Sequence, residues 1–154
     1  MKSAYRVLAY LIALGVVVQA ASIAFAFFGL GKWIDDGGTL DKAAMEDQSL
    51  EFTGVIGFPI HFLNAYLLAL LALILLIVSF FAKVSGGVKW AGFILLVVVV
   101  QILLGMFARG LPALGALHGM NALLVLGLAL TAATRATRDV SASEKSATSE
   151  REMV

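Results

Sequence analysis

The chain has 154 residues, of which 61% are hydrophobic and only 14% are charged, and its formal net charge is +1. Soluble globular domains carry about 25% charged residues, so this composition excludes that class, and we expect no nucleic-acid partner. The absence of cysteine excludes disulfides, iron–sulfur clusters and thiolate-bound zinc.

Four apolar runs follow one another along the chain. Each reaches the roughly 20 residues that a helix needs to cross about 30 Å of hydrocarbon. They predict an all-α integral membrane four-helix bundle over residues 1–134, with helices at about 5–30, 58–81, 90–107 and 112–133. The first run is too long for a signal peptide and lacks an A-x-A-type cleavage site, so we expect it to be retained.

The polar parts of the chain are a loop and a tail. Pro59 suits the first turn of the second helix. Residues 135–154 are rich in Ser, Thr, Ala and Glu, and they predict a disordered polar tail. The loop at 31–55 is expected to be solvated, and it carries six acidic residues, Asp35, Asp36, Asp41, Glu46, Asp47 and Glu51.

Basic residues predict the orientation. Six of them fall on one side of a four-pass topology: Lys2, Arg6, Lys83, Lys89, Arg135 and Arg138. Lys and Arg concentrate on the cytoplasmic side of membrane proteins. We therefore expect both termini in the cytoplasm, the acidic loop outside, and a location in a bacterial cytoplasmic membrane. Trp33 and Trp90 then lie at opposite interfaces.

The two histidines of the chain open the same motif, H-x-x-N-A-x-L. One copy begins at His61 with Asn64, and the other begins at His118 with Asn121. Residues three apart share one face of a helix. A histidine inside a membrane helix is energetically costly, and it is a functional-site hypothesis by default.

A longer repeat surrounds this motif. A Val-Val-Val-Gln sequence ends at Gln19 and again at Gln101, and each is followed after five residues by Phe-Ala. The chain is therefore predicted to be two repeated helix pairs that enter the membrane in the same direction, related by an axis along the membrane normal. Such an axis sets the second and fourth helices opposite each other, with His61 and His118 at similar depth.

Two facing imidazoles on different helices suit a b-type haem. His61 and His118 are the predicted axial ligands of the iron, within about 10 Å of the outer helix ends. Zinc fits poorly, because the helices offer it no further Cys, Asp or Glu ligand. The pattern favours a cytochrome b-like protein that transfers electrons near the outer face, to or from quinone or a redox protein. We expect a binding or electron-transfer protein more than an enzyme.

For several other polar residues the sequence allows more than one role. Asn64 and Asn121 could orient the imidazoles or bond each other. Arg109 could pair with haem propionates or only mark the interface. Gln19 and Gln101 are expected to join helices and not to bind iron. Three glycines are expected at close helix contacts: Gly105, Gly115 and Gly119. Gly119, beside His118, would also leave room for a macrocycle.

A cofactor-free interpretation is the main alternative. A membrane histidine can simply hydrogen-bond Asn or Gln of a neighbouring helix, at about 1 kcal/mol per bond. The chain would then be an accessory or assembly subunit of a membrane complex. A haem carrier is a third interpretation, and Ala- and Gly-rich helix faces also allow a homo-oligomer.

Residues 111–124, Leu-Pro-Ala-Leu-Gly-Ala-Leu-His-Gly-Met-Asn-Ala-Leu-Leu, strongly resemble the last-helix signature of a family of small four-helix bacterial membrane proteins. The resemblance covers about residues 5–135, and that family carries no assigned activity. More loosely, the plan resembles one half of haem A synthase, a four-helix bundle with histidines on its second and fourth helices near the outer face.

The second resemblance implies that His61 and His118 are an axial pair. It rests on architecture and on the Gln-x-x-x-Gly spacing of Gln101 and Gly105. The catalytic half of that enzyme has a Glu-x-x-His-Arg pattern, where this chain has Phe58 and Phe62 in place of Glu and Arg. The resemblance therefore implies the cofactor-holding half and not hydroxylation chemistry.

Overall fold

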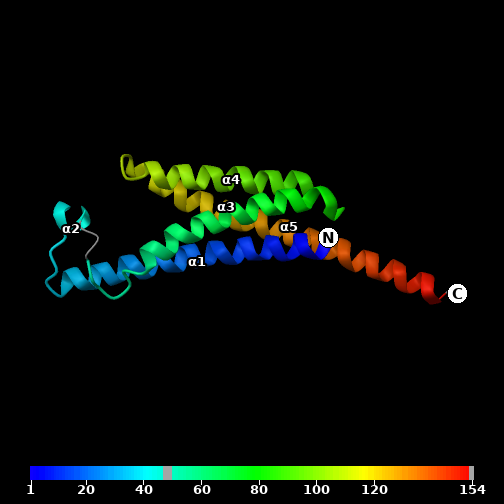
Figure 1. The fold of residues 1–154 in the computed structure, drawn as a ribbon, viewed down its shortest axis with the longest axis horizontal. Coiled ribbons are helices and arrows are strands. Elements are labelled where there is room, and N and C mark those ends of the chain that lie inside the picture. Colours follow the sequence, from blue (N-terminus) through cyan, green and yellow to red (C-terminus); the bar gives the residue numbers. More distant parts are fainter. Residues whose placement is uncertain (47–49, 153–154) are drawn as a thin grey trace. The chain divides into compact units, whose positions relative to one another are not determined.

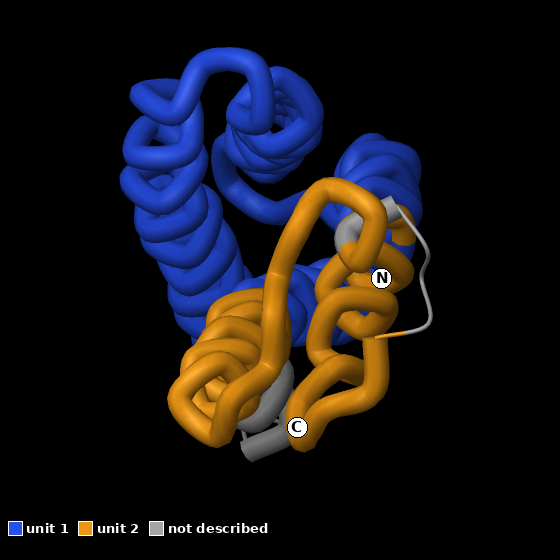
Figure 2. The backbone as a smooth tube through the Cα atoms, turned by 90° about the vertical axis from the view of Figure 1, so that its left-hand side faces the viewer, with its two compact units in different colours: residues 1–16, 67–154 blue, residues 17–66 orange. Residues whose placement is uncertain are grey.

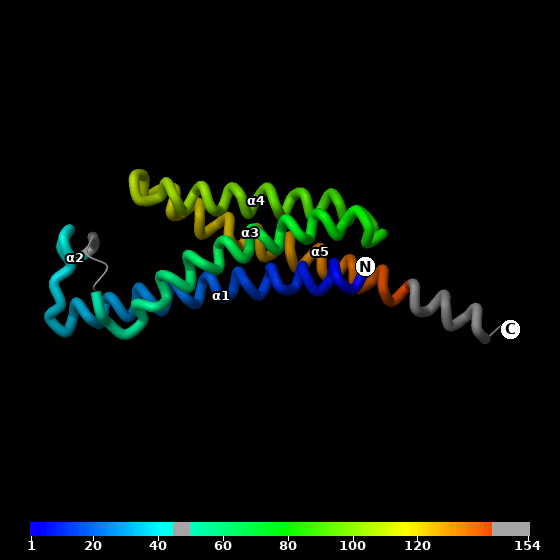
Figure 3. Tube along the Cα trace, in the orientation of Figure 1, coloured from blue at the N-terminus to red at the C-terminus, as the bar shows by residue number. Residues whose placement is uncertain are grey.

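The computed structural model describes residues 1–46 and 50–152, and all regular secondary structure in these ranges is helical. The order is α1 (Lys2–Asp35), α2 (Lys42–Glu46), α3 (Gly57–Ala82), α4 (Gly87–Phe107) and α5 (Pro112–Glu152) (Figures 1 and 3). The predicted all-α fold with four long apolar helices is confirmed. Residues 47–49 of the acidic loop and 153–154 of the predicted tail lie outside the described residues.

Four of these helices are long and apolar enough to cross a membrane: α1, α3, α4 and residues Pro112–Ala142 of α5. They leave large apolar side chains on the outside. Phe28 is 82% exposed, Leu123 is 70% exposed and Met120 is 67% exposed. In water such continuous apolar surface drives association, whereas lipid tails solvate it. The chain is a multi-pass membrane protein with four candidate spans.

The segment between α1 and α3 contains helix that the sequence did not predict. α1 continues through Asp35, and Lys32 Nζ donates a hydrogen bond to the carboxylate of Asp36 at 2.8 Å. The short helix α2 follows, and Asp41 Oδ1 accepts the Ala44 backbone N–H at 2.8 Å. An Asp before the first turn satisfies N–H groups that have no partner inside the helix. Some acidic residues of the loop therefore organise helix ends.

The chain divides into two compact units (Figure 2). Unit 1 consists of residues 1–16 and 67–154, and unit 2 consists of residues 17–66. The helices α1 and α3 contribute to both units. Unit 1 contains His118 with its surroundings, and unit 2 contains His61 with its surroundings.

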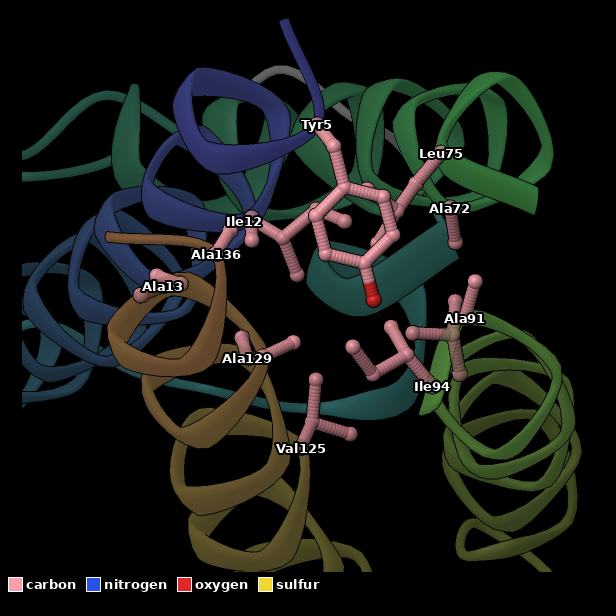
Figure 4. Close-up of a cluster of buried hydrophobic side chains, with 14 of the residues drawn as sticks. Tyr5, Ile12, Ala13, Ala72, Leu75, Ala91, Ile94, Val125, Ala129 and Ala136 are labelled. Atoms are coloured by element: carbon pink, nitrogen blue, oxygen red, sulfur yellow. The ribbon is translucent and has the colours of Figure 1, made fainter. Parts of the chain in front are cut away.

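The core of unit 1 combines a few large side chains with many alanines (Figure 4). Its largest fully buried side chains are Tyr5, Ile12, Leu75, Ile94 and Val125. The alanines beside them are buried as well, among them Ala9, Ala72, Ala91, Ala129 and Ala136. Small side chains let helix backbones approach closely, and membrane helices gain most of their association energy from such packing.

The helix α5 does not end near residue 133, where the sequence predicted its end. It continues through Glu152, and Ala136 is fully buried in the core of unit 1. The guanidinium of Arg135 lies 4.9 Å from the centre of the Trp90 ring. Residues 135–139 therefore pack by alanine contacts and a cation–π interaction, which do not need the large apolar residues that the sequence lacks here.

Asp139 joins three parts of unit 1. Its Oδ2 accepts the backbone N–H of Ser85 at 2.8 Å, and its backbone oxygen accepts a hydrogen bond from Lys2 Nζ at 3.2 Å. Nearby, the Tyr5 hydroxyl donates to the carbonyl of Gly87 at 3.1 Å. These bonds hold the N-terminus, the α3–α4 connection and α5 together.

In unit 2, α1 packs against the start of α3 through glycine. A Cβ added at Gly57 would collide with the carbonyl oxygen of Ser22, and one at Gly54 would crowd the carbonyl of Phe25. Gly54 also has φ 102°, a conformation that side chains disfavour. This close approach brings His61, one turn beyond Gly57, against the backbone of α1.

Candidate functional site

His118 is anchored to the backbone of α4. Its Nδ1 lies 3.0 Å from the carbonyl oxygen of Gln101, and the ring is half-buried. A carbonyl oxygen has two lone pairs and can only accept, so we infer that Nδ1 carries the proton. In this tautomer Nε2 has the lone pair, and Nε2 is the nitrogen that would coordinate a metal.

Asn121 extends this contact into a polar network within unit 1. Its Nδ2 donates to the side-chain Oε1 of Gln101 at 2.7 Å and to the backbone oxygen of Val97 at 3.0 Å. Gln101 therefore accepts from both motif residues, with its backbone oxygen for His118 and its amide oxygen for Asn121. The network joins α4 and α5 and fixes the rotation of both helices around it.

Gly105 forms the surface on which the His118 ring rests. A Cβ at this position would lie 3.0 Å from His118 Cε1 and 3.1 Å from His118 Nδ1. These distances are shorter than ordinary carbon contacts of about 3.5–4.0 Å. The ring can reach the Gln101 carbonyl because residue 105, one turn further along α4, has no side chain.

His61 makes the corresponding bond in unit 2. Its Nδ1 lies 3.0 Å from the carbonyl oxygen of Gln19 on α1, and its ring is also half-buried. The same chemical argument places the proton on Nδ1 and the lone pair on Nε2. Asn64 lies one turn further along α3 and is half-buried.

Gln19 in unit 2 differs from Gln101 in unit 1 in the hydrogen bonding of its side-chain amide oxygen. Gln19 Oε1 is buried and has no hydrogen-bond partner among the described residues. A buried amide oxygen without a donor is unfavourable by about 1–3 kcal/mol. The backbone oxygen of Gln19 is thus engaged, while its amide oxygen is not.

Arg109 lies apart from these contacts, in the turn between α4 and α5, where it is exposed. It follows Gly105 by four residues and so lies at the end of α4 that is nearer to His118.

The described residues contain no group of three or more His, Cys, Asp or Glu side chains that could hold a metal ion.

Both histidines make the same kind of hydrogen bond, but the sequence did not predict the atoms that they meet. Gln19 and Gln101 were expected to join helices. The Gln101 amide oxygen does so by accepting from Asn121, and the backbone oxygens of both glutamines accept from the histidines as well. A backbone carbonyl has no signature in the sequence. Gly105 touches the His118 ring as a close-contact glycine should, while a Cβ at Gly119 would meet nothing within 4 Å.

Comparisons with known proteins add no family to this description. No family model matches the chain, and no curated protein and no solved structure matches it either.

Proposed function

We propose that the protein binds haem b through His61 and His118 and transfers electrons near the outer face of a bacterial cytoplasmic membrane. One observation carries the proposal. Both histidines direct Nδ1 to a helix carbonyl at 3.0 Å, which selects the tautomer that ligates iron through Nε2.

The donor set fits this group. Haem iron accepts neutral imidazole, and a hydrogen bond from Nδ1–H to a carbonyl orients the ring and raises its basicity. The haem would supply one-electron chemistry. His61 and His118 would hold it, Asn121 would hold the glutamine that anchors His118, and Asn64 would lie one turn beyond His61. Arg109 would balance the propionate charge.

The proposal includes an internal duplication. The first helix pair would be α1 with α3, and the second α4 with α5. In support, Gln19 and Gln101 stand at the end of the same Val-Val-Val-Gln sequence, and each accepts the Nδ1 bond of the histidine on the next long helix. Parallel repeats of this kind occur in membrane transporters, where binding sites lie at the repeat interface.

The proposed orientation has both termini in the cytoplasm, because six basic residues surround the termini and the α3–α4 connection. A periplasm-specific reporter should be active when fused between Asp35 and Asp41 and inactive when fused at Ser85. Activity at Ser85 alone would reverse the orientation and move the histidines toward the cytoplasmic side.

A cofactor-free accessory or assembly subunit is the second candidate. It is favoured by the network of Gln101, His118 and Asn121, because these bonds form between two helices of the chain itself. Interhelical bonds of this type stabilise a membrane protein by about 0.6–2 kcal/mol without any ligand.

An absorption spectrum separates the two candidates. The protein is purified in mild detergent from haem-replete cells, and spectra are taken before and after dithionite. Haem binding predicts a red preparation whose reduced form has the sharp α-band of low-spin haem b. A colourless preparation that stays colourless after addition of haemin would refute haem binding and favour the accessory subunit.

A further inference from the structure

One end of unit 1 gathers basic residues from α1, the α3–α4 connection, α4 and α5. Hydrogen bonds bring these segments together, because Asp139 of α5 contacts both Lys2 and Ser85. The guanidinium of Arg135 also lies 4.9 Å from the centre of the Trp90 ring, near the start of α4. Six basic residues belong to this end of the unit: Lys2, Arg6, Lys83, Lys89, Arg135 and Arg138.

This end lies where three of the candidate membrane spans begin or stop. α1 begins at Lys2, α3 ends at Ala82 and α4 begins at Gly87. Unit 1 extends along α1 to Val16 and along α3 to Leu67, about 20 Å from this end on either helix. The basic residues are therefore at the level of the lipid phosphates. This level follows from the helix ends and holds for either orientation of the chain.

The protein supplies little negative charge to these basic residues. Asp139 is the only acidic residue of unit 1 up to residue 142, and its Oδ2 is engaged with the backbone N–H of Ser85 at 2.8 Å. Lys83, Lys89 and Arg135 are exposed, and none of them forms an ion pair with a residue that the structure describes. Unpaired cations at a membrane surface attract the anionic headgroups of lipids.

Arg135 and Lys89 both adjoin Trp90, a residue type that concentrates at the headgroup level. The guanidinium of Arg135 contacts the Trp90 ring, while no hydrogen bond joins its five N–H donors to the described residues. These donors form a rigid fork that matches two oxygens of a phosphate. Lys89 precedes Trp90 in the chain and adds a second cation.

Phe93 distinguishes a lipid from a soluble anion. Its ring centre lies 5.9 Å from Lys89 Nζ, and its side chain is 45% exposed. Phe93 follows Lys89 by one helical turn and so lies deeper in the membrane. A ligand whose phosphate meets Lys89 can thus continue along Phe93 with an apolar chain.

We infer that Arg135 and Lys89, beside Trp90, bind the phosphate of an anionic phospholipid such as phosphatidylglycerol, with an acyl chain along Phe93. A zwitterionic phospholipid has the same phosphate, but its ammonium group cancels the charge and is repelled by the basic residues around the site. Free phosphate has no acyl chain to contact Phe93. The site is independent of the proposed haem binding and electron transfer.

Native mass spectrometry of the full-length protein in mild detergent measures this binding. The protein is titrated with phosphatidylglycerol or with phosphatidylcholine of the same acyl chains. The wild type should bind phosphatidylglycerol at least about fivefold more tightly, since each basic residue at a membrane surface contributes about that factor. Arg135→Gln and Lys89→Gln should each lower the affinity for phosphatidylglycerol about fivefold and leave that for phosphatidylcholine unchanged. Equal affinities of the wild type for the two lipids would overturn the site.

Lys32→Gln is the matched control. It removes the same charge from an exposed lysine of α1, whose ammonium pairs with Asp36 at 2.8 Å, and it should bind phosphatidylglycerol like the wild type. An equal loss in Lys32→Gln and Lys89→Gln would overturn the site, because binding would then follow the net charge of the protein. Arg135→Lys keeps a cation beside Trp90 and should retain more affinity than Arg135→Gln.

Competition with inorganic phosphate tests the acyl-chain contact. Millimolar phosphate should leave phosphatidylglycerol bound, because it cannot replace the contact with Phe93. Displacement of the lipid by phosphate alone would identify a site for a soluble anion and overturn the assignment to a lipid.

Discussion

His118 in unit 1 and His61 in unit 2 each direct Nδ1 to the carbonyl oxygen of a glutamine at 3.0 Å. Around His118 the polar groups are paired, because Asn121 donates to the amide oxygen of Gln101. Around His61 the amide oxygen of Gln19 is buried and has no donor among the residues that the structure describes.

The helices also approach each other differently in the two units. In unit 1 the His118 ring lies on Gly105, so a side chain packs on a backbone. In unit 2 Gly57 packs on the carbonyl of Ser22, so the two backbones are in contact. The same hydrogen bond, from histidine Nδ1 to a glutamine carbonyl, thus forms with two different packing arrangements. The bond is common to both units, whereas its surroundings differ.

Removing either histidine should have the largest effect. His61→Ala and His118→Ala should each convert the iron to high spin or release it, because a six-coordinate site needs both nitrogens. The double variant should bind no haem. Absorption spectra of the dithionite-reduced proteins provide the measurement.

Ile60→Ala and Leu117→Ala, next to each histidine on exposed positions, serve as controls and should keep the low-spin spectrum. A low-spin spectrum that survives in either histidine variant would exclude the proposed ligation.

Gly57→Ala should destabilise unit 2 more than Gly105→Ala destabilises unit 1. The added methyl group meets a backbone carbonyl that cannot rotate away, and overpacking of this kind costs about 1–3 kcal/mol. Unfolding in mixed SDS micelles measures the loss. Gly31→Ala on α1 is the control, since a Cβ there meets nothing within 4 Å and should leave stability unchanged or raised.

Gly105→Ala should move the His118 ring by a few tenths of an ångström and weaken its bond to Gln101. The expected loss of stability is about 1 kcal/mol, with a changed spectrum or potential of bound haem. Gly92→Ala on the same helix has open space around its Cβ and should change neither. A spectrum and a potential that are identical in the Gly105 and Gly92 variants would remove the ring contact as a factor.

The smallest expected effect is the difference in stability between the Gln101→Leu and Gln19→Leu variants. Gln101→Leu leaves Asn121 with Val97 as its remaining acceptor and should cost about 1 kcal/mol. Gln19→Leu removes an amide oxygen for which the described part of the chain provides no donor, so it should be neutral or slightly stabilising. Equal losses in SDS unfolding would mean that Gln19 Oε1 does find a partner in the membrane.

Much of the fold could be read from the sequence, because it depends on local properties. Four runs of hydrocarbon length predict four helices whatever their partners are. The end of α5 could not be read in this way. Ala136 is buried by contact with other helices, and Asp139 is held by Lys2 and Ser85, which are distant in sequence.

The candidate site also has a part that the sequence predicts and a part that it does not. The sequence singled out His61 and His118 as candidates, because an ionisable side chain is costly in hydrocarbon at any position. It could not determine that their partners are the backbone oxygens of Gln19 and Gln101, since each residue has the same carbonyl.

The sequence by itself determined the class of the protein, its four apolar helices and the two H-x-x-N motifs, because composition and the spacing of residues along one helix are enough to fix them. Only the tertiary structure decided which atoms the motifs meet. Gly105 and Gly119 look alike in the sequence, yet only Gly105 touches the His118 ring. The physical reason is that the rotation of one helix against another is set by packing along the whole interface, and no local pattern encodes it.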